Sequence, residues 1–150
     1  MSIPRIRPPE SATTYEADVP FHDVDSLQIV WHGHYFKYFE IARTKLFTLH
    51  GIDGKEMMEL GYRLVVSHTE CKHVSPLAYK DRFRVSAWFT GEPDHRIEVL
   101  YEIWNLSTDK RCARGRTDLV TTDPAGTMLL ATPELLQKRI KRPPTPSERR

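Results

Sequence analysis

The sequence has no apolar run long enough to cross a membrane, and residues 1–11 lack the apolar segment of a signal peptide. We therefore expect a cytoplasmic protein without a membrane span. Cysteine is scarce as well: Cys71 and Cys112 are too few and too far apart for a CxxC zinc or redox motif, and two buried thiols are expected rather than a disulfide. The net charge is only +2, which excludes a global attraction to nucleic acid.

What is present fits one globular domain. The chain has 150 residues, which is long enough for a hydrophobic core. Its content of 39% hydrophobic and 28% charged residues is ordinary for a globular protein. Residues 1–14 contain three prolines and little that could pack, and residues 138–150 are basic and rich in proline. Both ends are expected to be disordered, with the single domain spanning residues 15–137. A basic tail is more often solvated than bound to RNA or anionic lipid, so no nucleic-acid partner is expected.

The segment of residues 21–50 organises the rest of the chain. It opens with the acidic pair Asp23 and Asp25 and continues into a helix rich in aromatic residues. Spacings of four and three place five residues on one apolar stripe: Tyr35, Phe39, Ala42, Leu46 and Leu49. Four more apolar residues lie off the stripe, Phe36, Tyr38, Ile41 and Phe47, so this helix is expected to be wrapped by other structure. A carboxylate just ahead of a buried helix suits chemistry, because the first N–H groups there are unpaired and attract negative charge.

The rest of the chain offers β-strands as the wrapping material. Strands are expected over residues 14–21, 62–74, 81–90, 96–105 and 111–122. A short helix is expected over residues 54–60, with Asp53 as its N-cap and Glu56 as the capping-box partner, and a terminal helix over residues 133–141. A long helix followed by strands predicts an α+β fold with an antiparallel sheet packed on the helix.

Two stretches resemble a known family: FHDVDSLQIVWHGHYFKYFEIAR and GYRLVVSHTECKHVSPLAYKDRFRVSAWF. They are similar to hot-dog-fold acyl-CoA thioesterases of the 4-hydroxybenzoyl-CoA thioesterase type, the Tol–Pal-associated acyl-CoA thioesterases above all. The resemblance covers residues 15–123. It implies a hot-dog fold, with a long central helix wrapped by an antiparallel β-sheet, in a homodimer or homotetramer whose active sites lie at the subunit interface. It also implies an acyl-CoA substrate and no separate cofactor, because coenzyme A is part of that substrate.

The resemblance assigns roles to individual residues. Asp25 matches the catalytic aspartate, and His32 matches the residue whose backbone N–H polarises the thioester carbonyl. Substrate-binding roles fall on Trp31, Gly33, Tyr35, His95 and Arg96. The chain departs from the motif at Gln28, which stands where the family has a glycine that permits a positive φ angle, and a different loop path is expected there.

Thioester hydrolysis suits these residues chemically. The leaving thiol has a pKa of about 8.5 and departs as a thiolate without a dedicated acid. The reaction then needs a nucleophile or general base and stabilisation of the developing oxyanion. Asp25 can attack the carbonyl or activate water, while N–H groups at the helix start bind the oxyanion.

Three alternatives remain open. A metal site would use His22, Asp23, Asp25, His32 and His34, but no further cluster completes it, and no metal is expected. A hydratase or dehydratase acting on acyl thioesters would use His32 or His34 with Glu40. Glu40 is expected instead to form an ion pair with Lys37 or Arg43. The third alternative is a non-catalytic acyl-CoA-binding module. For the aromatic residues near the helix start, packing in the core is the alternative to a role in substrate binding. The acyl group and the thiol carrier, coenzyme A or an acyl carrier protein, are left undetermined.

Overall fold

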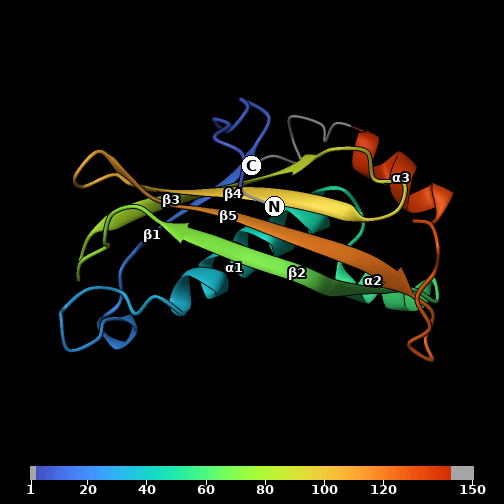
Figure 1. Ribbon diagram of the computed structural model, residues 1–150, viewed down its shortest axis with the longest axis horizontal. Helices are drawn as coiled ribbons and strands as arrows, with labels where there is room; N and C mark the ends of the chain where they lie inside the picture. Colours follow the sequence, from blue (N-terminus) through green and yellow to red (C-terminus); the bar gives the residue numbers. More distant parts are fainter. Residues whose placement is uncertain (1–2, 143–150) are drawn as a thin grey trace.

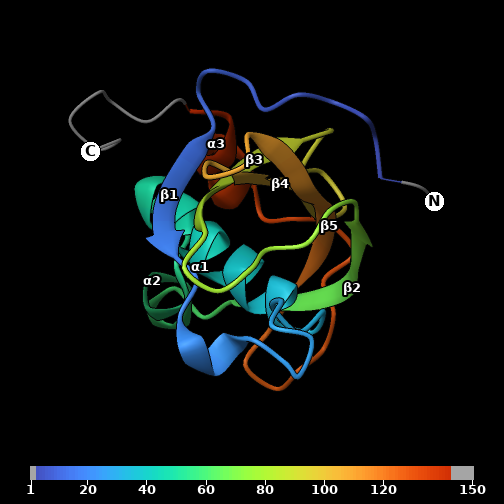
Figure 2. The ribbon, with the colours of Figure 1, turned by 90° about the vertical axis from the view of Figure 1, so that its left-hand side faces the viewer.

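The long helix α1 (His34–Leu49) lies along one face of a five-stranded antiparallel sheet (Figure 1). The computed structural model of the chain describes residues 3–142. In the order β1-β3-β4-β5-β2, the strands are β1 (Thr13–Asp18), β3 (Arg82–Thr90), β4 (Ile97–Asn105), β5 (Lys110–Thr122) and β2 (Arg63–His73). Figure 2 shows the sheet curving around α1. The predicted α+β architecture, a long helix wrapped by an antiparallel sheet, is confirmed.

Local sequence signals fix most of the boundaries. The side chain of Asp53 accepts the N–H of Glu56 at 2.9 Å and caps α2 (Gly54–Glu59), as predicted. The first strand is shorter than expected, because the chain leaves β1 and turns at Pro20 into the short 3-10 helix η1 (Phe21–Asp23). The predicted helix boundaries therefore agree with the structure to within a residue or two, whereas the first strand ends at Asp18 and not at residue 21.

One face of α1 forms the core of the molecule. The buried residues of α1 are Tyr35, Tyr38, Phe39, Ala42, Leu46 and Phe47. Two apolar residues off this face remain open, since Phe36 is 39% and Ile41 48% exposed. A single chain therefore does not wrap the helix on every side, contrary to expectation.

Close contact between Phe39 and the sheet sets the position of α1. The Phe39 ring stacks on Tyr101 of β4 with 4.5 Å between centroids. On β5, a Cβ atom at Gly115 would overlap the Phe39 ring, so the missing side chain lets the helix approach. Near the start of α1, Tyr38 meets Phe83 at 4.8 Å between centroids, which places this end of the helix beside the first residues of β3.

The C-terminal helix α3 (Glu134–Lys141) packs against the turn after α1. Arg139 Nη1 donates to Gly51 O at 2.6 Å and to Glu56 Oε1 at 2.5 Å. The expected terminal helix over residues 133–141 is thus confirmed, and residues 138–141 belong to it and not to a disordered tail. Residues 143–150 lie outside the described residues. The predicted domain limits stay predictions.

The two cysteines are free thiols. Cys112 is buried and Cys71 partly so, and burial raises their pKa values to about 11 and about 12. They form no disulfide, as expected. None of the helices within residues 3–142 combines the length and apolarity that a membrane crossing requires.

Candidate functional site

The loop between η1 and α1 folds back on itself as a small hairpin. Val24 pairs with Val30, and Asp25 N donates to Ile29 O at 2.9 Å. At its tip, Gln28 N donates to Asp25 O at 2.9 Å, and Gln28 has a φ angle of 62°, the left-handed conformation that glycine adopts most easily. A different loop path was expected at Gln28 because a glycine stands there in the family. That expectation is wrong for the φ angle, since Gln28 adopts the positive value that a glycine would permit. The flanking hydrogen bonds impose the positive φ on a residue with a side chain.

Asp23, the first of the acidic pair, is only 2% exposed and is turned toward α1. Its carboxylate accepts hydrogen bonds from Lys37 Nζ at 2.5 Å and from Tyr38 Oη at 2.6 Å. Burial alone would raise the pKa of the Asp23 carboxyl, but the hydrogen bonds from Lys37 and Tyr38, together with the charges of Lys37 and His34, lower the pKa overall. Asp23 is thus an ionised anchor that ties the loop to the first turns of the helix.

Asp25 has more open surroundings than Asp23. Its Oδ1 accepts the N–H of Leu27 at 2.8 Å, whereas Oδ2 accepts no hydrogen bond from any residue in the range 3–142. Asp23 and Asp25 flank Val24, whose backbone is extended, in the same short loop. The loop therefore presents one half-buried carboxylate whose second oxygen has no partner among the described residues.

The start of α1 supplies the hydrogen-bond donors. Trp31 N donates to Asp23 O at 3.0 Å, and His34 N donates to Trp31 O at 2.9 Å. The N–H groups of His32 and Gly33 donate to no acceptor within the described residues. The indole of Trp31, 47% exposed, packs so closely on Gly33 that a Cβ atom there would overlap the ring. Two free backbone donors thus lie beneath a partly exposed aromatic ring.

The end of β2 brings His73 to this helix start. Its ring lies 4.7 Å from that of Tyr35 and 6.3 Å from that of His32, between centroids. Burial lowers the pKa of His73, and repulsion from His32 adds to the effect. Tyr35 is buried, and burial raises its pKa to about 12. No local signal marks His73, because only the pairing of β2 in the sheet carries it here.

The two basic residues predicted to bind substrate lie elsewhere. His95 and Arg96 occupy the turn between β3 and β4, where Arg96 Nη1 is 3.7 Å from Asp118 Oδ2. The start of α1 adjoins the first residues of β3, whereas its last turns meet the end of β3 through Phe47 and Phe89 at 5.8 Å. The β3–β4 turn is therefore at the opposite end of the sheet from Asp25. One chain does not bring these residues together, and the predicted role of His95 and Arg96 remains a prediction.

The structure does not support the ion pair predicted for Glu40 or the metal site considered as an alternative. Lys37 pairs with Asp23, and Arg43 Nη1 donates to Tyr101 Oη at 3.0 Å. Glu40 forms no ion pair with either cation within the described residues, so the expected pair with Lys37 or Arg43 is wrong. Within residues 3–142, no group of three or more His, Cys, Asp and Glu side chains is close enough to hold a metal ion.

An apolar cavity of about 510 Å³ lies between the second half of α1, α2 and the β2–β5 edge of the sheet. Its lining includes Phe47, Met57, Leu64 and Leu119. This volume lies in the range of cavities that hold small molecules, and the lining suits an aliphatic or aromatic group. It lies at the end of α1 opposite to Asp25.

The chain is similar to known proteins in sequence and in fold. A family model described as the Thioesterase-like superfamily matches residues 19–148. A protein of Aquifex aeolicus that carries the name of an esterase is 35% identical over 71 residues, which are 47% of this chain and 56% of that protein. The match thus spans little more than half of that relative's length.

Two solved structures of the same architecture are a CoA thioesterase and a protein in complex with CoA. A 1,4-dihydroxy-2-naphthoyl-CoA thioesterase from Synechocystis superposes with a TM-score of 0.75 at 22% identity, over 86% of this chain and 95% of that one. A Staphylococcus aureus protein in complex with CoA superposes with a TM-score of 0.78 at 17% identity, over 86% of this chain and 81% of that one. At these identities the likeness concerns the fold, and the predicted hot-dog fold is confirmed.

Proposed function

Because the chain belongs to the thioesterase-like superfamily, we propose that it hydrolyses the thioester of an acyl- or aroyl-CoA to the free acid and CoA. The observation that carries this proposal is that a free carboxylate oxygen and free amides occur on a loop and a helix start that Asp23 ties together. Asp25 Oδ2 accepts no hydrogen bond from the described residues, and the N–H groups of His32 and Gly33 at the helix start have no acceptor there. A thioester carbonyl needs both kinds of group, one to attack it and one to hold its oxygen.

The reaction can follow either of two routes. In the first, Asp25 Oδ2 attacks the carbonyl carbon, the carbon–sulfur bond breaks with release of CoA thiolate, and water then hydrolyses the mixed anhydride and regenerates the carboxylate. In the second, Asp25 takes a proton from a water molecule as its oxygen attacks the carbonyl carbon. The carbon–sulfur bond then breaks with release of CoA thiolate, and Asp25 returns the proton to solvent. In both, the negative charge on the carbonyl oxygen is bound by the N–H groups of His32 and Gly33. One such donor contributes about 3 kcal/mol to transition-state stabilisation.

A second copy of the chain would complete the site. β2 is an edge strand, and Val65 and Val66 on it are 45% and 42% exposed, so the strand can accept a partner. Antiparallel pairing of two β2 strands about a two-fold axis would put the start of one beside the end of the other. His73 at the end of β2 lies next to the helix start, and Leu64 near its beginning lines the 510 Å³ cavity.

In this homodimer, the apolar cavity of each copy would receive the acyl group of a thioester held at the helix start of the other. The same two-fold relation would bring the β3–β4 turn of the second copy, with His95 and Arg96, to the end of the sheet that carries Asp25. Those cations would then be placed to bind the phosphates of CoA. Coenzyme A serves as part of the substrate in this proposal, and no separate cofactor is needed.

A free-thiol assay on a panel of acyl-CoAs tests the function. The panel contains aryl, short-chain and long-chain thioesters together with an acyl carrier protein thioester, and it is run on the wild type and on Asp25→Asn. We expect Asp25→Asn to lose at least about a hundredfold in thiol release while folding and binding persist. Asp18→Asn is the matched control, because Asp18 is an exposed acid on β1. Full activity of Asp25→Asn would refute the role of that residue. A wild type that binds acyl-CoA without releasing thiol would refute hydrolysis in favour of a binding module.

A further inference from the structure

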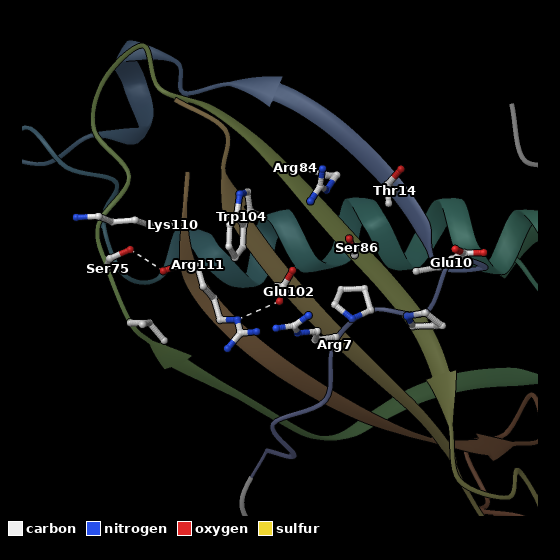
Figure 3. Close-up of a pocket in the computed structure, with 14 residues that line it drawn as sticks. Arg7, Glu10, Thr14, Ser75, Arg84, Ser86, Glu102, Trp104, Lys110 and Arg111 are labelled. Atoms are coloured by element: carbon white, nitrogen blue, oxygen red, sulfur yellow. Dashed lines mark hydrogen bonds and ion pairs between the residues drawn. The ribbon is translucent and has the colours of Figure 1, made fainter. Parts of the chain in front are cut away.

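The face of the sheet that points away from α1 is charged and is crossed by the N-terminal segment of residues 3–12. Figure 3 shows this side, with Arg7 of the segment in front of Glu102 and Arg111 and with α1 behind the sheet. Strand register places Ser86, Glu102, Arg114 and Lys72 in one row across β3, β4, β5 and β2. This outer face lies on the side of the sheet opposite to the loop of Asp25.

Two arginines of β5 on this face have a carboxylate partner. Arg111 Nε donates to Glu102 Oε2 at 3.0 Å, and Arg116 Nη2 lies 3.0 Å from both Glu98 Oε2 and Asp118 Oδ2. These pairs occupy the acidic side chains that neighbour Arg114 on β4 and β5. No carboxylate of β4 or β5 is therefore left for Arg114.

Arg114 is 6% exposed, and two of its nitrogens are buried without a partner. Its Nε and Nη1 atoms donate to no acceptor within residues 3–142. A buried guanidinium with unused donors is costly, since both its charge and its N–H groups have lost water. Arg114 also lines an open cavity, so its guanidinium can meet a partner that is not part of the described chain.

The cavity next to Arg114 has a volume of about 490 Å³ and lies between residues 3–5 and the β2–β5 pair. Its charged lining is Arg5, Lys72 and Arg114 against the single carboxylate of Glu70. The Oε1 atom of Glu70 is also buried without a donor, while its Oε2 lies 3.4 Å from His68 Nε2. The cavity thus combines an excess of positive charge with one acceptor that lacks a donor.

We propose that this outer-face cavity binds a small oxyanion that also carries a hydrogen-bond donor, with Arg114 as the main ligand. The anionic oxygens are held by Arg114, with Lys72 and Arg5 nearby, and an O–H group of the same ligand donates to Glu70. A phosphate that keeps one proton has both features, and so does a hydroxycarboxylate such as glycolate. Sulfate at neutral pH has the charge but no proton to donate, so it should bind more weakly. The site is independent of the proposed thioester hydrolysis.

Thermal unfolding of the full chain tests the proposal, with inorganic phosphate, glycolate and sulfate as probes at constant ionic strength. For the wild type we expect phosphate or glycolate at ten times its Kd to raise Tm by roughly 3 °C or more, and sulfate to raise it less. The stronger of phosphate and glycolate identifies the ligand class. Arg114→Met should abolish the shift, and without anion it should be as stable as the wild type or more so, because an uncompensated charge has been removed. Glu70→Gln should remove the preference over sulfate, since an amide can donate to sulfate.

Arg82→Gln is the matched control, because Arg82 lies on the same face of the sheet, outside the cavity, and pairs with Asp18. It should respond to phosphate as the wild type does. Equal shifts in the wild type, Arg114→Met and Arg82→Gln would overturn the proposal in favour of a general salt effect. It would also be overturned if no anion shifts the Tm of the wild type. A change of oligomer mass in Arg114→Met would then mean that Arg114 pairs with a carboxylate of a second copy.

Discussion

The ammonium of Lys37, in the first turn of α1, lies 2.5 Å from the carboxylate of Asp23 in the preceding loop. The carboxylate is 2% exposed and the ammonium side chain 43% exposed, so this ion pair joins a buried loop residue to the helix surface. Tyr38 donates to the second oxygen at 2.6 Å. The pair holds the loop that carries Asp25 against the helix that carries the free N–H groups.

Replacement of Asp23 should therefore cost stability in a pH-dependent way. At pH 7, Asp23→Asn should lower the free energy of unfolding by about 1–3 kcal/mol, because a buried charged hydrogen bond is lost. The pKa of Asp23 is lowered in the folded chain, so its contribution is complete above the unfolded value of about 3.9 and disappears as pH falls through the folded pKa. Urea unfolding at several pH values checks this. The difference between wild type and Asp23→Asn should shrink below about pH 4, and a constant difference would contradict the lowered pKa. Asp18→Asn, an exposed acid, serves as the control.

Gly33→Ala should reduce turnover, because its methyl group would overlap the Trp31 ring and push either the indole or the helix start aside. We expect thiol release to fall about 10- to 100-fold, as for the disturbance of an oxyanion donor. The double variant Trp31→Ala with Gly33→Ala should recover much of the loss, since the clash is gone. Gly54→Ala is the control, because nothing lies within 4 Å of a Cβ at that glycine. Without recovery in the double variant, Trp31 would have a role of its own beyond the contact with Gly33.

Gln28→Gly should raise the free energy of unfolding by about 1 kcal/mol, because glycine tolerates the φ angle of 62° that Gln28 adopts. Thiol release should be unchanged, since the hairpin hydrogen bonds around the tip remain. Chemical denaturation measures the gain. Lys80→Gly provides the comparison, because Lys80 has a φ angle of 71° in another loop and should gain a similar amount. A loss of stability in Gln28→Gly alone would mean that the glutamine side chain makes a contact worth more than the strain.

Val65→Lys should separate the proposed homodimer, since a charge on an edge strand opposes strand pairing. The particle mass measured by light scattering should fall to that of one chain, 17.5 kDa, and thiol release should fall with it. Leu130→Lys places the same charge at a position that is 88% exposed and outside the sheet, and it should leave both unchanged. A wild type that is monomeric and fully active would contradict the two-copy site.

Much of the fold follows from local sequence. The stripe of Tyr35, Phe39, Ala42 and Leu46 predicts α1 because its period is that of the helix itself, and Asp53 predicts the start of α2 because a cap acts within three residues. Alternation in β3 and β4 fixes which residues face the core. The first strand ends early because Pro20 and η1 interrupt a pattern that alternation alone would continue.

Most helices and strands, the α+β class and the loop that carries the acidic pair can be predicted from the sequence, since each depends on contacts between near neighbours in the chain. The packing of the loop against α1 makes Asp23 the buried anchor and leaves Asp25 a free oxygen, and no local pattern distinguishes the two acids. The tertiary structure also brought His73 to the helix start and separated His95 from it by the length of the sheet. Strand order and long-range ion pairs depend on which surfaces meet, and spacing along the chain does not encode that choice.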